Sequence, residues 1–112
     1  MELPRPIPPA LAEMIAARLR VIGDPTRIRI LDLLRDGELT VSELTERLGT
    51  SQQNVSKHLG VLLQAGIVAR RKEGTASYYK VADPGVYSLC EQVCGGLRQQ
   101  LSELTALVGG AG

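Results

Sequence analysis

Two groups of side chains in the middle of this sequence have chemistry suited to a polar or charged partner. The first group consists of Ser51, Gln52, Gln53, Ser56 and Lys57. Gln can form two hydrogen bonds with adenine, Ser can bond either type of base, and Lys suits guanine or a phosphate. These residue types, closely spaced, predict contacts with the base edges of DNA. The alternative interpretation is the solvated face that every amphipathic helix has.

The second group is a basic run with a nearby hydroxyl, Arg70, Arg71, Lys72 and Thr75. Residues 51–81 hold five Lys or Arg and only Glu73 as an acidic residue, so their net charge is +4 in a chain of net charge +1. This concentration of charge predicts a polyanion-binding surface, with the basic run at phosphates or in a minor groove. A charged edge strand that prevents aggregation is the alternative.

Length and composition exclude several other functions. The 112 residues suit one domain, and 44% hydrophobic residues are enough to form a core. Aromatic residues make up only 3%, which disfavours a single-strand binder that stacks bases. One His and two Cys make a three- or four-ligand metal site within one protomer difficult. Since the sequence has no paired carboxylates, nucleophile–base pair or phosphate-binding glycine loop, we do not expect an enzyme.

The sequence also lacks the usual signals for export or membrane insertion. No apolar run reaches about 18 residues, so neither a membrane span nor a membrane partner is expected. The N-terminus has no basic stretch followed by an apolar block. Two cysteines do not make a disulfide framework, and a cytoplasmic location is therefore expected.

Apolar spacing and helix caps predict five helices and one hairpin. The helices are expected at 10–22, from 25 to Gly37, from 41 to Gly49, from 52 to Gly66, and from Asp83-Pro84 to about 108. Strands are expected at 67–72 and 75–81, with a turn at Glu73-Gly74. Four prolines within residues 1–9 predict an N-terminal arm, and residues 109–112 are expected to be a flexible tail.

Local signals within these elements are specific. Asp24 before Pro25 predicts an N-cap, and Thr40 with Glu43 predicts a capping box. Residues Ile28, Leu31 and Leu34 are expected to form the buried stripe of the second helix. His58, at the core boundary of the fourth helix, is expected to form an internal hydrogen bond rather than to contact a base or a metal.

The order of elements predicts a mostly α (α+β) fold, a winged helix-turn-helix with the order α-α-α-α-β-β-α over residues 10–108. Only about two residues around Gly49-Thr50 join the third and fourth helices, which suits a helix-turn-helix. The hairpin that follows is then a wing. Both groups of candidate side chains lie on this unit, and the N-terminal turns of a recognition helix are the part that reaches base edges.

The segments IGDPTRIRIL (22–31) and SQQNVSKHL (51–59), with the basic wing 70–74, resemble the ArsR/SmtB family of winged-helix repressors. The resemblance extends over residues 20–81. It implies a homodimer with the first and last helices at the interface. It also implies an inverted-repeat operator near the protein's own gene and an inducer that alters binding to it.

The chain departs from this family at its usual metal sites. Many members bind soft metals through a Cys-x-Cys pair at the start of the third helix, where this chain has Thr40 and Ser42. Neither side chain is a thiolate. Others use Asp and His ligands on the fifth helix, which contains no His here. Both departures argue against the standard sites.

Cys90 and Cys94 are the remaining candidates for a sensing role. At a spacing of i,i+4 their Cβ atoms are about 5–6 Å apart, too far for an unstrained disulfide. They could share a transition metal or arsenite, with thiolates from both protomers. Alternatively, they continue the apolar seams 90, 97, 104 and 94, 101, 108 and simply pack at the dimer interface.

We therefore predict a sequence-specific DNA-binding transcriptional regulator whose partners are double-stranded DNA and a second copy of the chain. Its input signal stays open among three options. These are thiol chemistry or a metal at the two cysteines, nickel or zinc on carboxylates and the N-terminal amine, and a separate co-regulator protein. A winged-helix module that docks a protein instead of DNA is the alternative function, and salt-insensitive binding would favour it.

Overall fold

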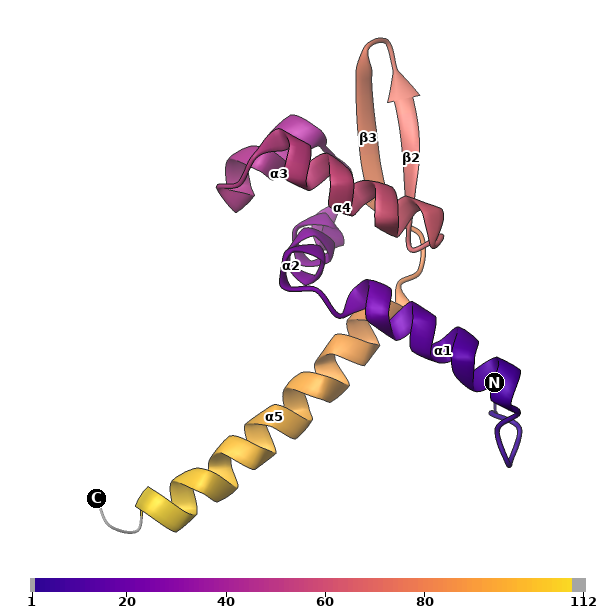
Figure 1. Cartoon of the computed structure of the whole chain (residues 1–112). Helices are drawn as coiled ribbons and strands as arrows, with labels where there is room; N and C mark the ends of the chain where they lie inside the picture. Colours follow the sequence, from indigo (N-terminus) through magenta and orange to yellow (C-terminus); the bar gives the residue numbers. More distant parts are fainter. Residues whose placement is uncertain (1, 110–112) are drawn as a thin grey trace.

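The computed structural model describes residues 2–109 and contains five α-helices and a small three-stranded sheet. Two of the strands form a hairpin that projects from the helices (Figure 1). The element order is α1 (Pro9–Ile22), α2 (Pro25–Leu33), the short 3₁₀ helix η1 (Leu34–Asp36), β1 (Leu39–Thr40), α3 (Val41–Leu48), α4 (Gln52–Gln64), β2 (Val68–Glu73), β3 (Ala76–Val81) and α5 (Gly85–Gly109). The predicted winged helix-turn-helix order is confirmed, with one strand added. No helix within these residues is long and apolar enough to span a membrane.

Several predicted boundaries were wrong by a few residues. Helix α1 begins at Pro9, because proline suits the first helical position. Helix α2 gives way to η1 after Leu33, ahead of the predicted stop at Gly37. The wing turn lies one residue later than predicted, since β2 continues through Glu73. Gly109 still belongs to α5, and the rest of the predicted tail, residues 110–112, lies outside the described residues.

The sheet has the order β1-β3-β2, and both of its pairings are antiparallel. Strand β1 was not predicted, because a strand of two residues is too short to show an alternation of apolar and polar side chains. It pairs Leu39 with Tyr79 and Thr40 with Tyr78. Thr40 also caps α3 through the predicted capping box, since its side chain accepts from the Glu43 backbone N–H at 3.2 Å. The base of the wing is thus joined directly to the start of the helix-turn-helix.

The core lies between α2, α3, α4 and the sheet. Its fully buried members include Ile30, Leu44, Leu59 and Ile67. The predicted stripe of α2 was wrong at Ile28, which is 41% exposed. Ile28 instead lies on the side of α2 that faces α5, where it lines an apolar hollow together with residues of α5.

Arg27 connects three helices. Its guanidinium donates to the backbone carbonyls of Arg20 and Val21 at the end of α1, and to Nδ1 of His58 in α4 at 3.0 Å. His58 is buried, and its predicted internal hydrogen bond is confirmed. The Arg27 backbone N–H also donates to Asp24 Oδ1 at 3.1 Å, which caps α2 as predicted and lowers the pKa of that carboxyl. This one side chain therefore joins α2 to both α1 and α4.

Helix α5 extends away from the rest of the domain (Figure 1). Only its first two turns pack on the core, through Val86 and partly through Tyr87 and Leu89. Every residue from 91 to 108 is exposed in the single chain. This long exposed segment includes several large apolar side chains, namely Val93, Leu97, Leu101, Leu104, Leu107 and Val108.

Candidate nucleic-acid interface

The turn between α3 and α4 is fixed by local backbone chemistry. Gly49 ends α3 with φ = 69°, in the left-handed region that glycine adopts at little cost. Ser51 is the N-cap of α4: its Oγ accepts from the Asn54 backbone N–H at 3.1 Å. The first turn of α4 is thereby held close behind α3.

Helix α4 separates its apolar and polar residues cleanly. Val55, His58, Leu59 and Leu62 are buried and hold the helix against the core. The predicted base-contacting residues are all exposed: Ser51, Gln52, Gln53, Ser56 and Lys57. Gly60 continues that face with open space where a side chain would be. The structure therefore presents the polar group on the N-terminal turns of α4, with no packing role for it.

The wing stands beside this face and projects beyond α3 and α4 (Figure 1). Arg70 and Lys72 are exposed, and neither side chain forms a hydrogen bond or ion pair within residues 2–109. Gly74, with φ = 62°, makes the tip, and Thr75 follows it, exposed. A polar hollow of about 380 Å³ lies between the tip and the helix-turn-helix, and its lining residues are Thr40, Val41, Ser42, Gln52, Thr75, Ala76 and Ser77. Gln52 and Thr75, predicted from separate segments, thus share one depression.

Arg71 differs from its two basic neighbours because each nitrogen of its guanidinium donates a hydrogen bond to a carboxylate. Its Nε and one terminal nitrogen donate to the two carboxylate oxygens of Glu38 at 3.1 and 3.0 Å, and the other donates to Glu73 at 2.6 Å. The guanidinium also lies over the Tyr78 ring, 4.7 Å from its centroid. These hydrogen bonds raise the pKa of Arg71 and lower the pKa of Glu38. Sequence reasoning missed Glu38, since 33 residues separate it from Arg71 and nothing local marks it.

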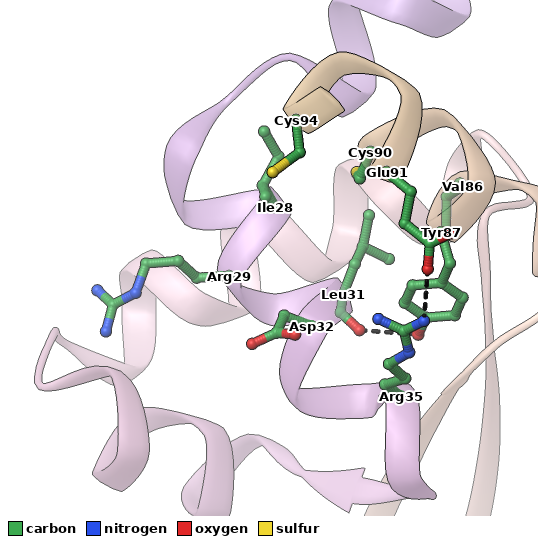
Figure 2. A pocket seen from close by; sticks show the side chains of 10 residues that line it. All are labelled: Ile28, Arg29, Leu31, Asp32, Arg35, Val86, Tyr87, Cys90, Glu91 and Cys94. Atoms are coloured by element: carbon green, nitrogen blue, oxygen red, sulfur yellow. Dashed lines mark hydrogen bonds and ion pairs between the residues drawn. The ribbon is translucent and has the colours of Figure 1, made fainter. Parts of the chain in front are cut away.

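Cys90 and Cys94 lie together at a second place, between α2 and α5 (Figure 2). Cys90 is half-buried and Cys94 is exposed. They line a hollow of about 320 Å³ with charged side chains around it, including Arg29, Asp32 and the ion pair of Arg35 with Glu91 at 3.0 Å.

Tyr87 forms one wall of the same hollow. Its hydroxyl donates to the Leu31 carbonyl at 2.8 Å and its ring lies under the Arg35 guanidinium. Burial raises the pKa of this phenol. Both cysteines also line an apolar hollow on the α1 side, beside Leu19 and Ile22.

The donor set of the described residues does not fit nickel or zinc within one protomer. No group of three or more His, Cys, Asp or Glu side chains is close enough to hold a metal ion anywhere in residues 2–109. Cys90 and Cys94 provide only two sulfur donors on one helix face, a set of soft ligands that is smaller than a complete metal site needs.

Comparisons with known proteins agree with this geometry. A family model described as "Helix-turn-helix domain" matches residues 22–71. The uncharacterized HTH-type transcriptional regulator MJ1325 of Methanocaldococcus jannaschii is 39% identical over 82 residues, which are 72% of this chain and 92% of that protein. The crystal structure of Mycobacterium tuberculosis Rv0081 superposes with a TM-score of 0.74 at 36% identity, covering 83% of this chain and 94% of the other.

A third similar protein is Mb0332 of Mycobacterium bovis, whose solution structure is described as a homodimeric winged helix-turn-helix DNA-binding domain of a possible ArsR-family regulator. Its TM-score is 0.71 at 31% identity, with 84% of this chain and 87% of that chain covered. The resemblance predicted from the two sequence segments is confirmed, and with it the expectation of a non-enzymatic DNA-binding protein. The chain belongs to the ArsR/SmtB family of winged helix-turn-helix transcriptional regulators.

Proposed function

We propose that this regulator binds an inverted-repeat operator as a homodimer, with one α4 in each of two successive major grooves. The observation that carries the proposal is the exposed polar group on α4, which has no packing role in the domain. In this arrangement Gln52, Gln53 and Ser56 contact base edges, and Lys57 contacts guanine or a phosphate. The exposed basic residues of the wing contact the adjacent backbone.

The homodimer is supported by the uncovered apolar surface on α5. Leu97, Leu101 and Leu104 are each more than half exposed. Exposed apolar surface of this extent marks an interaction site. Met14 and Leu19 of α1 are also exposed, and Leu19 lines an apolar hollow with Val93 and Leu97 of α5. A second copy presenting the same helices would cover this surface. The similar domain Mb0332 is described as homodimeric.

The test is fluorescence anisotropy with a labelled duplex from the region upstream of the protein's own gene and a scrambled duplex of equal composition. We expect specific binding to be at least 1,000-fold tighter than binding to the scrambled duplex at physiological salt. The Gln53→Ala variant should lose this discrimination, whereas Gln64→Ala, at the exposed C-terminal end of the same helix, should keep it. Equal affinity for both duplexes would refute the proposal.

We further propose that a thiophilic inducer, of which arsenite is the simplest example, acts at Cys90 and Cys94. Support comes from the shared hollow, which both sulfur-bearing side chains line from one helix. Nickel or zinc would need ligands beyond the side chains of residues 2–109, either from a second protomer or from the predicted N-terminal amine, which lies outside the described residues.

The inducer test adds a panel of Ni, Zn, Co, Cd, arsenite and a persulfide donor to the anisotropy assay. We expect one of these to change operator affinity in the wild type and to have no effect on the Cys90→Ser/Cys94→Ser variant. If none changes the affinity, the cysteines are packing residues and a co-regulator protein supplies the signal.

A further inference from the structure

We propose that Arg71 is a positioning residue that fixes the wing to the strand leading into α3, and that Arg70 and Lys72 carry the wing's charge to DNA. This inference rests on the proposed operator binding and assigns different roles to three neighbouring basic residues. It departs from the expectation, drawn from sequence, that all three contact DNA.

The first argument is the cost of freeing Arg71. Three of its five guanidinium N–H groups are already engaged, two in parallel hydrogen bonds to Glu38 and one to Glu73 at 2.6 Å, and turning the side chain toward a phosphate would break these bonds. Bidentate, charge-assisted pairs of this kind are among the strong hydrogen bonds in proteins. The move would also leave two unpaired carboxylates beside the DNA backbone, where they would repel it.

The second argument is that the hydrogen bonds of Arg71 connect the wing to the segment that leads into α3. Glu38 directly precedes β1, and Thr40 of β1 is the N-cap of α3. Arg71 lies on β2, opposite Tyr78 of β3, over whose ring it stacks. One guanidinium therefore joins all three strands. A two-stranded hairpin is marginally stable by itself, so this link sets the angle at which the wing leaves the domain.

The third argument is the alternation of side chains along β2. Arg70 and Lys72 lie on the opposite face of the strand from Arg71. Lys72 pairs across the wing with Ser77, which lines the polar hollow beside Gln52 of α4. The two basic side chains without partners among residues 2–109 thus lie on the face of the wing opposite to Arg71, free of the contacts that hold it.

The two roles predict opposite results for Glu38→Gln. If Arg71 contacts a phosphate, this substitution removes a competing carboxylate and binding becomes tighter. If Arg71 positions the wing, the same substitution weakens binding, and we expect a loss of about 3- to 10-fold even though a negative charge has been removed. Arg71→Gln should weaken binding by a similar factor, and the double variant by no more than either single one.

The salt dependence of affinity separates the roles again. Each phosphate contact contributes about 0.9 to the slope of log K against log salt concentration. We expect Lys72→Gln to lower the slope by about 0.9 per protomer, and Arg71→Gln to leave it unchanged. The assay uses the full-length protein and the labelled upstream duplex, with thermal unfolding of each variant as the check on folding.

Arg71→Lys keeps the experiment decisive if Arg71→Gln fails to fold. Lysine keeps the charge but cannot form the two parallel bonds to Glu38. A positioning role predicts that Arg71→Lys binds as weakly as Glu38→Gln, and near wild-type affinity would overturn the proposal. Tighter binding by Glu38→Gln would overturn it as well. If wild-type protein does not prefer its upstream duplex, operator binding itself is refuted, which is a different result.

Discussion

Replacing Arg27 with methionine tests whether the junction of α1, α2 and α4 holds the domain together. The guanidinium makes two short hydrogen bonds, to the Val21 carbonyl and to His58 Nδ1, and a longer one of 3.4 Å to the Arg20 carbonyl. Hydrogen bonds that involve a charged group contribute about 1.5–3 kcal/mol each. Methionine keeps most of the aliphatic stem but none of the donors, and it leaves the buried imidazole without its partner.

From the two short bonds alone, we expect Arg27→Met to lower the free energy of unfolding by about 3 kcal/mol, the lower bound of their sum. A domain of this size has a total stability of about 5–15 kcal/mol. With a urea m-value near 1.5 kcal/mol/M, the midpoint should fall by about 2 M. The measurement is urea unfolding followed by circular dichroism at 222 nm, at one fixed protomer concentration.

The matched control is Arg29→Met, two residues along the same helix. Arg29 is exposed, and its side chain forms no hydrogen bond or ion pair among residues 2–109. Its replacement should change stability by less than about 0.5 kcal/mol. If Arg27→Met costs under 1 kcal/mol, or no more than the control, the three-helix junction does not stabilise the fold as argued.

Three further predictions concern the dimer interface, the stability at low pH and the N-cap of α4. Leu101 is 62% exposed in one chain, and Leu101→Ala should remove about 2 kcal/mol of association free energy per protomer. The dimer dissociation constant measured by sedimentation equilibrium should then rise about 1,000-fold. Gln99→Ala, on the opposite helix face, should leave it unchanged. Arg18 donates to Asp83 at 2.7 Å and lowers the pKa of that carboxyl below its ordinary value of 3.8, so this contribution is present above that pH and is lost as pH falls through the lowered pKa. When urea unfolding is measured at pH 7 and at pH 3, the free energy of unfolding should therefore fall less for Asp83→Asn than for wild type. Ser51→Ala removes the cap of α4 and should lower the urea-unfolding stability by about 1 kcal/mol, and an unchanged midpoint would contradict that role.

The helices and the helix-turn-helix could be predicted because their signals are local. Asp24 before Pro25, and Thr40 three residues before Glu43, each satisfy backbone donors within one turn, so sequence spacing determines the structure. The exposed group on α4 followed from the same reasoning, because the buried Val55 and Leu59 fix which face is left over. The resemblance to a known family then supplied the expected role of that face.

The features that sequence reasoning missed all depend on residues far apart in the chain. Strand β1 exists because β3 offers it a partner 38 to 40 residues away. The pairing of Arg71 with Glu38 turns one member of a basic run into a residue whose guanidinium is held within the wing. Ile28 fits the apolar period of α2 but faces α5, whose distal part is exposed among the described residues. Periodicity identifies an apolar face without saying which chain will cover it.

The exposed distal part of α5 makes folding depend on concentration. Most helical stability in proteins comes from tertiary packing rather than from intrinsic propensity, and Gly95 and Gly96 each lower helix stability by about 1 kcal/mol relative to alanine. Because every side chain from 91 to 108 is exposed in one protomer, we expect this segment to unwind when the partner dissociates. Helix content would then fall on dilution, and assembly of the regulator would include coupled folding of its last helix. Operator occupancy would consequently decline more steeply than in proportion to the amount of protein, which gives the regulator a threshold rather than a graded response.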